Sequence, residues 1–312
     1  MSYYEALAKL ASSVEPEPSE TSFFSSPDKN LDPKLFSNNS LKPALRKSIL
    51  STLFNYLSQF YKGVDSWTHA WLAGSGVSYQ WRASRTPADL DCLIGIDYPR
   101  FRAQNPDYQG LSDKEIAAEL NEALAELDKQ TEDFMGAYEL TFYVNVRSDI
   151  TEIKPYAAYS LTDDEWTVEP SHETPVTDPS WDLKVQSESD YADKIISRYN
   201  EAAAGVRGAS NPAARTNAEA ALKQAVDQGA ALFDDIHQGR KQAFSPEGQG
   251  YSDFYNYRWQ AGKHAGTIPA LRKLKDIKKG AQEMFETETY GVELPNANML
   301  IRRAVINRKG NE

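Results

Sequence analysis

In the first half of the chain, segments whose hydrophobic residues have the spacing of a helix alternate with segments that have the spacing of a strand. Leucine or isoleucine recurs every fourth residue over 43–62, which predicts an amphipathic helix. Residues 67–73 are largely apolar and predict a short strand. Residues 89–97 predict the clearest strand, because apolar side chains occupy every second position. Ser112, with Glu115 three residues later, predicts a capped helix that continues to about residue 134.

Further along the chain the pattern changes from mixed to helical. Residues 138–146 and 150–161 predict two strands, and the short segment 147–149 between them predicts a hairpin. An acidic, proline-containing stretch over 162–189 predicts a connection between domains. After it the periodicity is helical only, with segments at 188–206, 212–237, 267–285 and 296–308.

This order of elements predicts an α+β protein, in which a mixed β-sheet domain is followed by an all-α C-terminal domain. We expect a flexible N-terminal arm over 1–40, because that segment is rich in Pro, Ser, Asn and Asp. The sheet domain is then expected over 41–170, a linker over 171–189 and the helical domain over 190–312.

Composition is that of a globular protein with a core of its own. Of the 312 residues, 40% are hydrophobic and 25% are charged. Cys92 is the single cysteine, which excludes an internal disulfide and a cysteine-based zinc site. The sequence has no apolar run near 18 residues and no N-terminal signal pattern, so we expect no membrane span and a cytoplasmic location.

Charge narrows the set of expected partners. A net charge of -11 disfavours generic duplex DNA, because an acidic surface repels the phosphate backbone. The charge is uneven, since residues 251–312 contain 11 Lys/Arg against 7 Asp/Glu. An anionic macromolecule would therefore favour the C-terminal third.

Two aspartates on one strand are the first candidates for chemistry. Asp89 and Asp91 are two positions apart, so they share the face opposite the apolar one, about 7 Å apart along the strand. Hard divalent cations such as Mg²⁺ or Mn²⁺ prefer carboxylate oxygens. The pair therefore predicts ligands for a catalytic metal.

A glycine-rich turn precedes the aspartates. Gly74, Ser75 and Gly76 end one predicted strand and open what we expect to be a helix, where backbone N–H groups can approach phosphate oxygens. Arg82 and Arg85 lie between this turn and the aspartates, where guanidinium groups can neutralise a triphosphate.

The run LAGSGVSYQWRASRTPADLDCLIGI resembles the signature of the polymerase-β-type nucleotidyltransferase superfamily. That signature is a strand, a Gly-Ser turn and an Asp-x-Asp strand. With TFYVN and PYAAYSLTDDEW, the run is also similar to nucleotidyltransferase-like proteins of actinobacteriophages, which would place the protein in the host cytoplasm. The resemblance implies a palm-like catalytic domain with Mg²⁺ or Mn²⁺ as cofactor. It also implies an NTP as substrate and release of pyrophosphate.

The resemblance also implies a third carboxylate on an adjacent strand, and two residues fit. Glu139 begins the strand with the cleaner alternation, and Glu152 follows the predicted hairpin turn, where polymerases of the family place their third acid. Glu139 is the first choice as catalytic residue and metal ligand, and Glu152 is the alternative.

The acceptor of the nucleotidyl group is left open by the sequence. An RNA 3′ end, a protein hydroxyl and a small molecule are all compatible with it. The segment from His237 to Gln260 mixes aromatic and basic side chains, which is typical either of nucleotide or acceptor binding or of a packed domain seam. The alternative functions are a catalytically inactive nucleotide-binding or interaction protein on the same fold, and an unrelated α/β protein.

Overall fold

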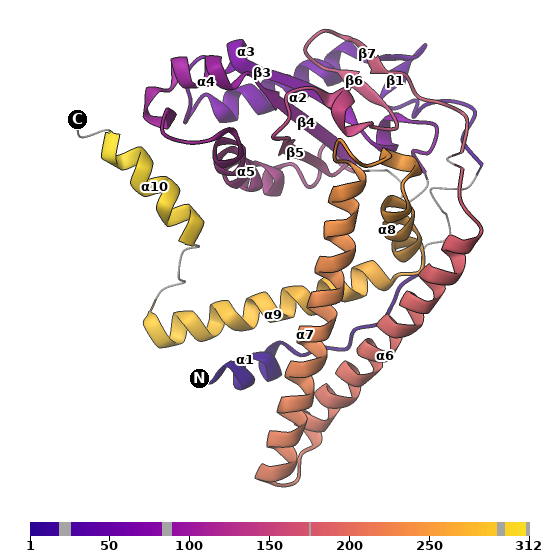
Figure 1. The fold of residues 1–312 in the computed structure, drawn as a ribbon, viewed down its shortest axis with the longest axis vertical. Helices are drawn as coiled ribbons and strands as arrows, with labels where there is room; N and C mark the ends of the chain where they lie inside the picture. Colours follow the sequence, from indigo (N-terminus) through magenta and orange to yellow (C-terminus); the bar gives the residue numbers. More distant parts are fainter. Residues whose placement is uncertain (19–25, 83–88, 175, 292–296, 310–312) are drawn as a thin grey trace. The chain divides into compact units, whose positions relative to one another are not determined.

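The structure, a computed structural model, describes residues 1–18, 26–82, 89–174, 176–291 and 297–309 (Figure 1). Its contacts divide the chain into two compact units, each with a hydrophobic core of its own. The sheet unit comprises Phe23–Pro175, Phe244–Tyr251 and Asn296–Glu312. The helical unit comprises Met1–Ser22, Val176–Ala243 and Ser252–Pro295. Both units are therefore discontinuous in sequence.

The sheet unit is built on one mixed five-stranded sheet with the order β5-β4-β3-β6-β7. Its strands are β3 (Thr68–Ala73), β4 (Leu90–Ile96), β5 (Leu140–Val144), β6 (Ala158–Ser160) and β7 (Glu165–Val168). Only β4 and β5 are parallel to each other, and the other neighbours are antiparallel. The expected α+β class with a mixed sheet and a helical C-terminal region is confirmed.

Strand alternation gives the sheet one largely apolar face. Leu90 and Cys92 of β4 and Leu140 of β5 point into the main core, which helices cover. These helices include α2 (Pro43–Leu57) and α5 (Asp113–Gln130), whose apolar stripes are buried as the sequence pattern predicts. The capping box between Ser112 and Glu115 is also confirmed.

The opposite face of the sheet is mixed in character. Its centre holds a small apolar cluster that includes Trp71, Ala73 and Ala158. Towards the end of the sheet where β4 and β5 begin, the same face presents Asp91 and Thr141. The opposite end of this face is polar as well, since His69 of β3 pairs with Asp163 at 2.8 Å.

The short elements of the sheet unit connect these strands and helices. They are α3 (Val64–Trp67), α4 (Tyr98–Gln104), α10 (Ala297–Lys309), the hairpin β1 (Phe36–Ser37) and β2 (Ser40–Leu41), and the 3₁₀ turns η1 (Ser75–Val77), η2 (Pro106–Tyr108), η3 (Ile150–Ile153) and η4 (Gly250–Ser252). In α10, Arg302 forms ion pairs with Glu119 and Glu122 of α5. The helix expected at the end of the all-α domain is therefore held by the sheet unit.

The predicted hairpin of strands 138–146 and 150–161 is wrong. β4 and β3 lie between β5 and β6 in the sheet, so these two strands are not neighbours. Residues 150–153 form η3, and Lys154 has the left-handed backbone conformation with φ 47°. A left-handed residue followed by Pro155 ends any regular pairing there. β7 also falls inside the stretch expected to be a connection.

The N-terminal segment is more ordered than the expected flexible arm. Helix α1 (Tyr3–Leu10) begins with a capping box between Ser2 and Glu5, and its Leu7 is buried in the core of the helical unit. Further along, Leu35 and Phe36 are buried in the core of the sheet unit. The described parts of 1–40 thus contribute to two cores.

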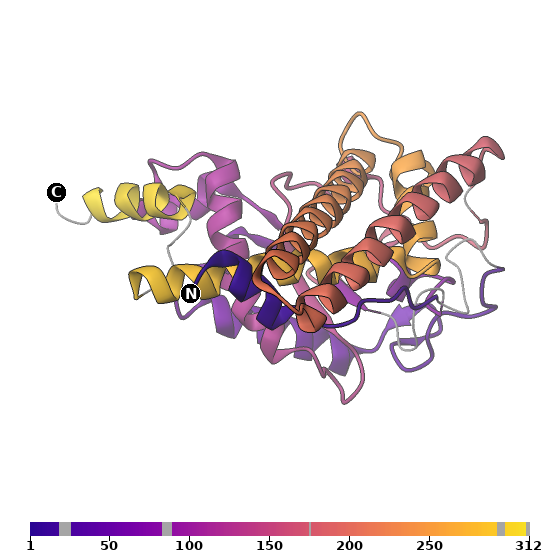
Figure 2. The ribbon, with the colours of Figure 1, turned by 90° about the horizontal axis from the view of Figure 1, so that it is seen from below.

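The helical unit contains four further helices. They are α6 (Ser180–Gly208), α7 (Pro212–Ala243), α8 (Phe254–His264) and α9 (Thr267–Tyr290). Helix α1 packs against two of them, α7 and α9. Helices α6 and α7 run side by side (Figures 1 and 2). At the contact of α7 with α9, a Cβ atom on Gly229 would clash with Leu274, so the two helices approach very closely. Among the described residues, no helix is both long enough and apolar enough to cross a bilayer.

Candidate functional site

The glycine turn after β3 lies directly against the second aspartate of β4. Gly74 has φ 87° and ψ -160°, a conformation that is essentially restricted to glycine. A Cβ atom at Gly74 would lie 3.0 Å from Oδ2 of Asp91, and one at Gly76 would lie 2.5 Å from the backbone oxygen of Asp89. Both glycines are therefore needed for the close approach of this turn to the Asp-x-Asp segment.

The helix expected to open at this turn is not formed. Ser75 begins η1, a 3₁₀ turn of three residues, and its carbonyl accepts hydrogen bonds from the N–H and the Oγ of Ser78. Ser75 itself is half-buried. The turn is thus a compact loop, and its shape comes from backbone conformation instead of a helix end.

Asp91 is positioned by its neighbours on both sides in the sheet. It pairs with Ala73 of β3 and with Thr141 of β5. The Thr141 hydroxyl donates a hydrogen bond of 3.3 Å to Asp91 Oδ1. Because Asp91 is half-buried, this contact helps to hold the carboxylate towards the Gly74 turn. Thr141 was not among the expected site residues.

Glu139 lies two residues before Thr141 and directly before the first residue of β5. The Leu90 N–H donates to the Glu139 carbonyl at 2.8 Å, which extends the parallel β4–β5 register to place Glu139 opposite Asp89. Asp89 and Glu139 are therefore neighbours, each directly before the first residue of its strand. The role of Glu139 as third acid stays a prediction.

A further carboxylate stands near this group. Asp128 of α5 accepts a hydrogen bond from the Phe142 N–H at 2.8 Å. Burial raises the pKa of Asp128, and the negative charge of Glu139 raises it further. Asp128 could not be predicted as a neighbour of this group, because it lies on a helix and the strand pattern contains no information about it.

Glu152 occupies a different environment. It lies on η3 instead of a strand, and its carboxylate pairs with Arg147 at 2.5 Å. About half of each side chain is exposed. The strand expected to carry Glu152 beside the aspartates is absent.

The donor atoms of the site match the expected cation in type. Asp89, Asp91 and Glu139 offer the carboxylate oxygens that Mg²⁺ and Mn²⁺ prefer. Within the described part of the chain, no three acidic, histidine or cysteine side chains are gathered closely enough to hold a metal ion. The donor atoms are therefore of the type that binds Mg²⁺ or Mn²⁺. That the three carboxylates bind one cation together stays a prediction.

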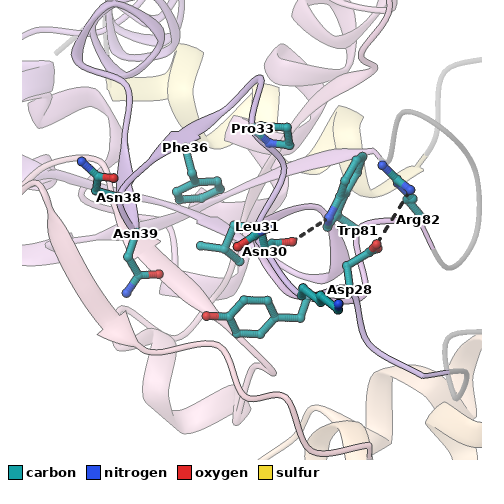
Figure 3. Close-up of a pocket in the computed structure, with 11 residues that line it drawn as sticks. Asp28, Asn30, Leu31, Pro33, Phe36, Asn38, Asn39, Trp81 and Arg82 are labelled. Atoms are coloured by element: carbon teal, nitrogen blue, oxygen red, sulfur yellow. Dashed lines mark hydrogen bonds and ion pairs between the residues drawn. The ribbon is translucent and has the colours of Figure 1, made fainter.

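Arg82 lines a pocket formed with the segment around Asp28 (Figure 3). Its guanidinium lies 4.3 Å from the centre of the Trp81 ring and 3.8 Å from Asp28 Oδ1. The pocket has a volume of about 590 Å³, and Phe36 and Tyr79 are among its lining residues. Arg85, the second expected phosphate ligand, lies outside the described residues.

An aromatic pair from distant parts of the sheet unit completes the surroundings of the turn. The Tyr251 hydroxyl would lie 3.6 Å from a Cβ atom at Gly74. The Tyr251 ring contacts Tyr156, with ring centres 5.1 Å apart. Lys154 anchors the returning segment, since its Nζ donates to the Gly248 carbonyl at 2.5 Å. Tyr156 and Tyr251 belong to aromatic-rich stretches, but their contact could not be predicted from the sequence, because they are far apart in the chain.

Comparison of the chain with protein-family models, with curated proteins and with solved structures gives no match. The site therefore has to be interpreted from its own geometry.

Proposed function

We propose that the sheet unit is a metal-dependent nucleotidyltransferase of the polymerase-β type, with a palm-like fold. It would move an NMP group from an NTP to an acceptor and release pyrophosphate. The observation that carries the proposal is the contact between the Asp91 carboxylate and the Gly74 turn. In such an enzyme a metal-binding carboxylate must lie next to the loop that receives the phosphates, and the contact between Asp91 and the Gly74 turn supports this arrangement.

Each residue of the site has a role in this proposal. Asp89, Asp91 and Glu139 hold the cation, which when bound neutralises triphosphate charge and makes the acceptor hydroxyl more acidic. Gly74 and Gly76 let the turn pack against Asp91 and Asp89, so the backbone of the turn lies beside the carboxylates that would hold the cation.

Two further groups would orient the Asp91 carboxylate and the nucleobase. Thr141 holds the Asp91 carboxylate through its hydrogen bond. The Tyr156–Tyr251 pair supplies an aromatic wall next to the turn, against which a nucleobase ring can stack.

A second candidate function rests on a specific observation. A catalytically inactive nucleotide-binding protein needs the turn and the aromatic wall but no closed metal cage. The lack of a gathered three-ligand group among the described residues favours this alternative. The two candidates differ in whether pyrophosphate is released.

Binding can be tested by thermal unfolding with Mn²⁺ and each NTP in turn. At a ligand concentration 100 times Kd, binding adds about 2.7 kcal/mol to the free energy of unfolding, so the melting temperature should rise by several degrees. Asp91→Asn should abolish this rise, because it removes a metal ligand. The exposed Asp107 provides the control, since Asp107→Asn should keep the full shift. A shift that survives Asp91→Asn would overturn the assignment.

A further inference from the structure

A cluster of positive side chains lies at the junction of α7, α8 and α9 in the helical unit. We define the His237 cluster as His237, Arg240 and Lys241 of α7 with Arg272 and Lys275 of α9. Lys241 and Arg272 are exposed, and the other three are partly exposed. In a chain with a net charge of -11, such a local concentration of positive charge needs an explanation.

Aromatic rings, and not carboxylates, organise most of these cations. Arg240 lies 4.9 Å from the centre of the Trp259 ring, which is 3% exposed. Arg272 and Lys275 lie 5.7 Å and 5.2 Å from the ring centre of Phe233, which is 5% exposed. Cation–π contacts fix these side chains without removing their charge.

Little of the charge is neutralised within the protein. In the described part of the chain, no carboxylate lies within ion-pair distance of Arg240, Lys241 or Arg272, and only Lys275 is paired, with Asp234 at 2.6 Å. The Arg240 Nε atom is buried and makes no hydrogen bond to a described residue.

The nearby Arg258 shows what a structural arginine looks like in this unit. Its guanidinium is paired with both Glu188 and Asp235 and is 11% exposed. Among the residues that the structure describes, the cations of the His237 cluster have no such carboxylate partners, apart from Lys275. Packing alone therefore does not account for their positions.

The positive charges of the cluster affect the pKa of the His237 imidazole. Burial, followed by the positive charges of the four neighbouring cations, lowers the pKa of His237 to about 4; the contributions of the cations decrease in the order Lys241, Arg240, Lys275 and Arg272. The Trp259 and Phe233 rings beside it carry no charge. His237 is thus neutral at pH 7, and four permanent cations define the cluster.

We propose that the His237 cluster binds the phosphate backbone of single-stranded nucleic acid. Four cations on two helices can contact successive phosphates of one strand. A flexible single strand can touch this cluster alone, whereas a stiff duplex would bring its phosphates against the acidic remainder of the surface. The strand would also be the acceptor of the nucleotidyl group, because its end carries the hydroxyl that such a reaction needs. This part of the inference rests on the proposed function.

Binding can be tested on the full chain by fluorescence anisotropy without any NTP. The probes are 5′-fluorescein-labelled 20-nucleotide RNA and DNA strands of the same mixed sequence, and a duplex of the same length. We expect the single strands to bind more tightly than the duplex. The double variant Arg240→Gln/Arg272→Gln should weaken binding about tenfold and reduce the slope of log affinity against log salt by about 1.4.

Arg198→Gln is the matched control, because Arg198 is an exposed arginine of α6 outside the cluster. It should leave the affinity unchanged. If the double variant unfolds, Lys241→Gln replaces it and should lower the slope by about 0.7, since Lys241 is exposed. No binding by the wild type, an equal loss in Arg198→Gln, or tighter binding of the duplex would overturn the proposal. NTP binding is measured separately, so failure of either proposal is recognised on its own.

Discussion

At the scale of single residues, Gly74 is where backbone conformation and site chemistry meet. Its φ of 87° excludes most side chains, and the neighbouring Asp91 carboxylate leaves no room for one. Any substitution would therefore displace either the turn or the carboxylate. The close approach of the turn to the Asp91 carboxylate depends on this one position.

The ionisation of His237 leads to a prediction about stability and pH. Because its pKa is about 4 in the folded state and near 6.5 in the unfolded chain, the unfolded state binds the proton first as pH falls. Stability should therefore be full above pH 6.5 and decrease between about pH 6.5 and 4. After allowance for solvent screening, the loss is on the order of 1–2 kcal/mol.

Urea unfolding of the wild type and of His237→Gln at a series of pH values measures this loss. All other groups titrate in both proteins, so the difference between the two curves isolates His237. The wild type should lose stability relative to the variant over that range. Parallel curves from pH 7 to 4 would show that the pKa of His237 is not lowered.

Part of the site could be predicted from local sequence at this scale. Asp89 and Asp91 on one face follow from alternation, and the same rule would have found Thr141 two positions after Glu139. Tyr251 could not be found, because it reaches Gly74 only through the packing of 244–251 against Lys154. Contacts over such sequence distances leave no periodic signal.

At the scale of elements, β5 illustrates how an edge strand is protected. Its outer N–H groups at Phe142 and Val144 donate to Asp128 and Asn121 of α5. Side chains of a helix thus satisfy backbone groups that would otherwise be open to another chain. Since Glu139 and Thr141 belong to this segment, α5 also fixes that side of the candidate site.

Asn121→Ala is expected to destabilise the protein by about 1–3 kcal/mol, because it leaves two backbone groups without their partners. The amide of Asn121 accepts from the Val144 N–H at 2.7 Å and donates to its carbonyl at 3.1 Å. Chemical denaturation gives the change in the free energy of unfolding. Gln130→Ala, at an exposed position of the same helix, should cost little. Equal effects of both changes would contradict this role of Asn121.

Elements with strong periodicity were predictable, and those shaped by their neighbours were not. The strand over 89–97 and the helix after Ser112 follow from alternation and capping. The predicted hairpin was wrong because residues 150–153 form a 3₁₀ turn. Their apolar side chains pack on the face of the sheet, and the segment does not pair with β5. Short apolar runs are compatible with either outcome.

At the scale of the whole molecule, each terminal segment belongs to the unit that the order along the chain does not predict. Helix α1 joins the helical unit, while α10 joins the sheet unit through Arg302. Composition along the chain suggested a simple order of arm, sheet domain, linker and helical domain. Where a short amphipathic helix docks depends on which core leaves apolar surface uncovered, and local composition does not encode that.

The most direct test of nucleotidyl transfer is release of pyrophosphate from each of the four NTPs with Mn²⁺ and total RNA. Wild type should release pyrophosphate with at least one NTP. Asp91→Asn should lower the rate by about 100-fold or more, because a catalytic metal contributes several kcal/mol to transition-state stabilisation. Asp107→Asn should react at the wild-type rate. No release above a protein-free blank with any NTP, or equal rates in wild type and Asp91→Asn, would contradict the assignment.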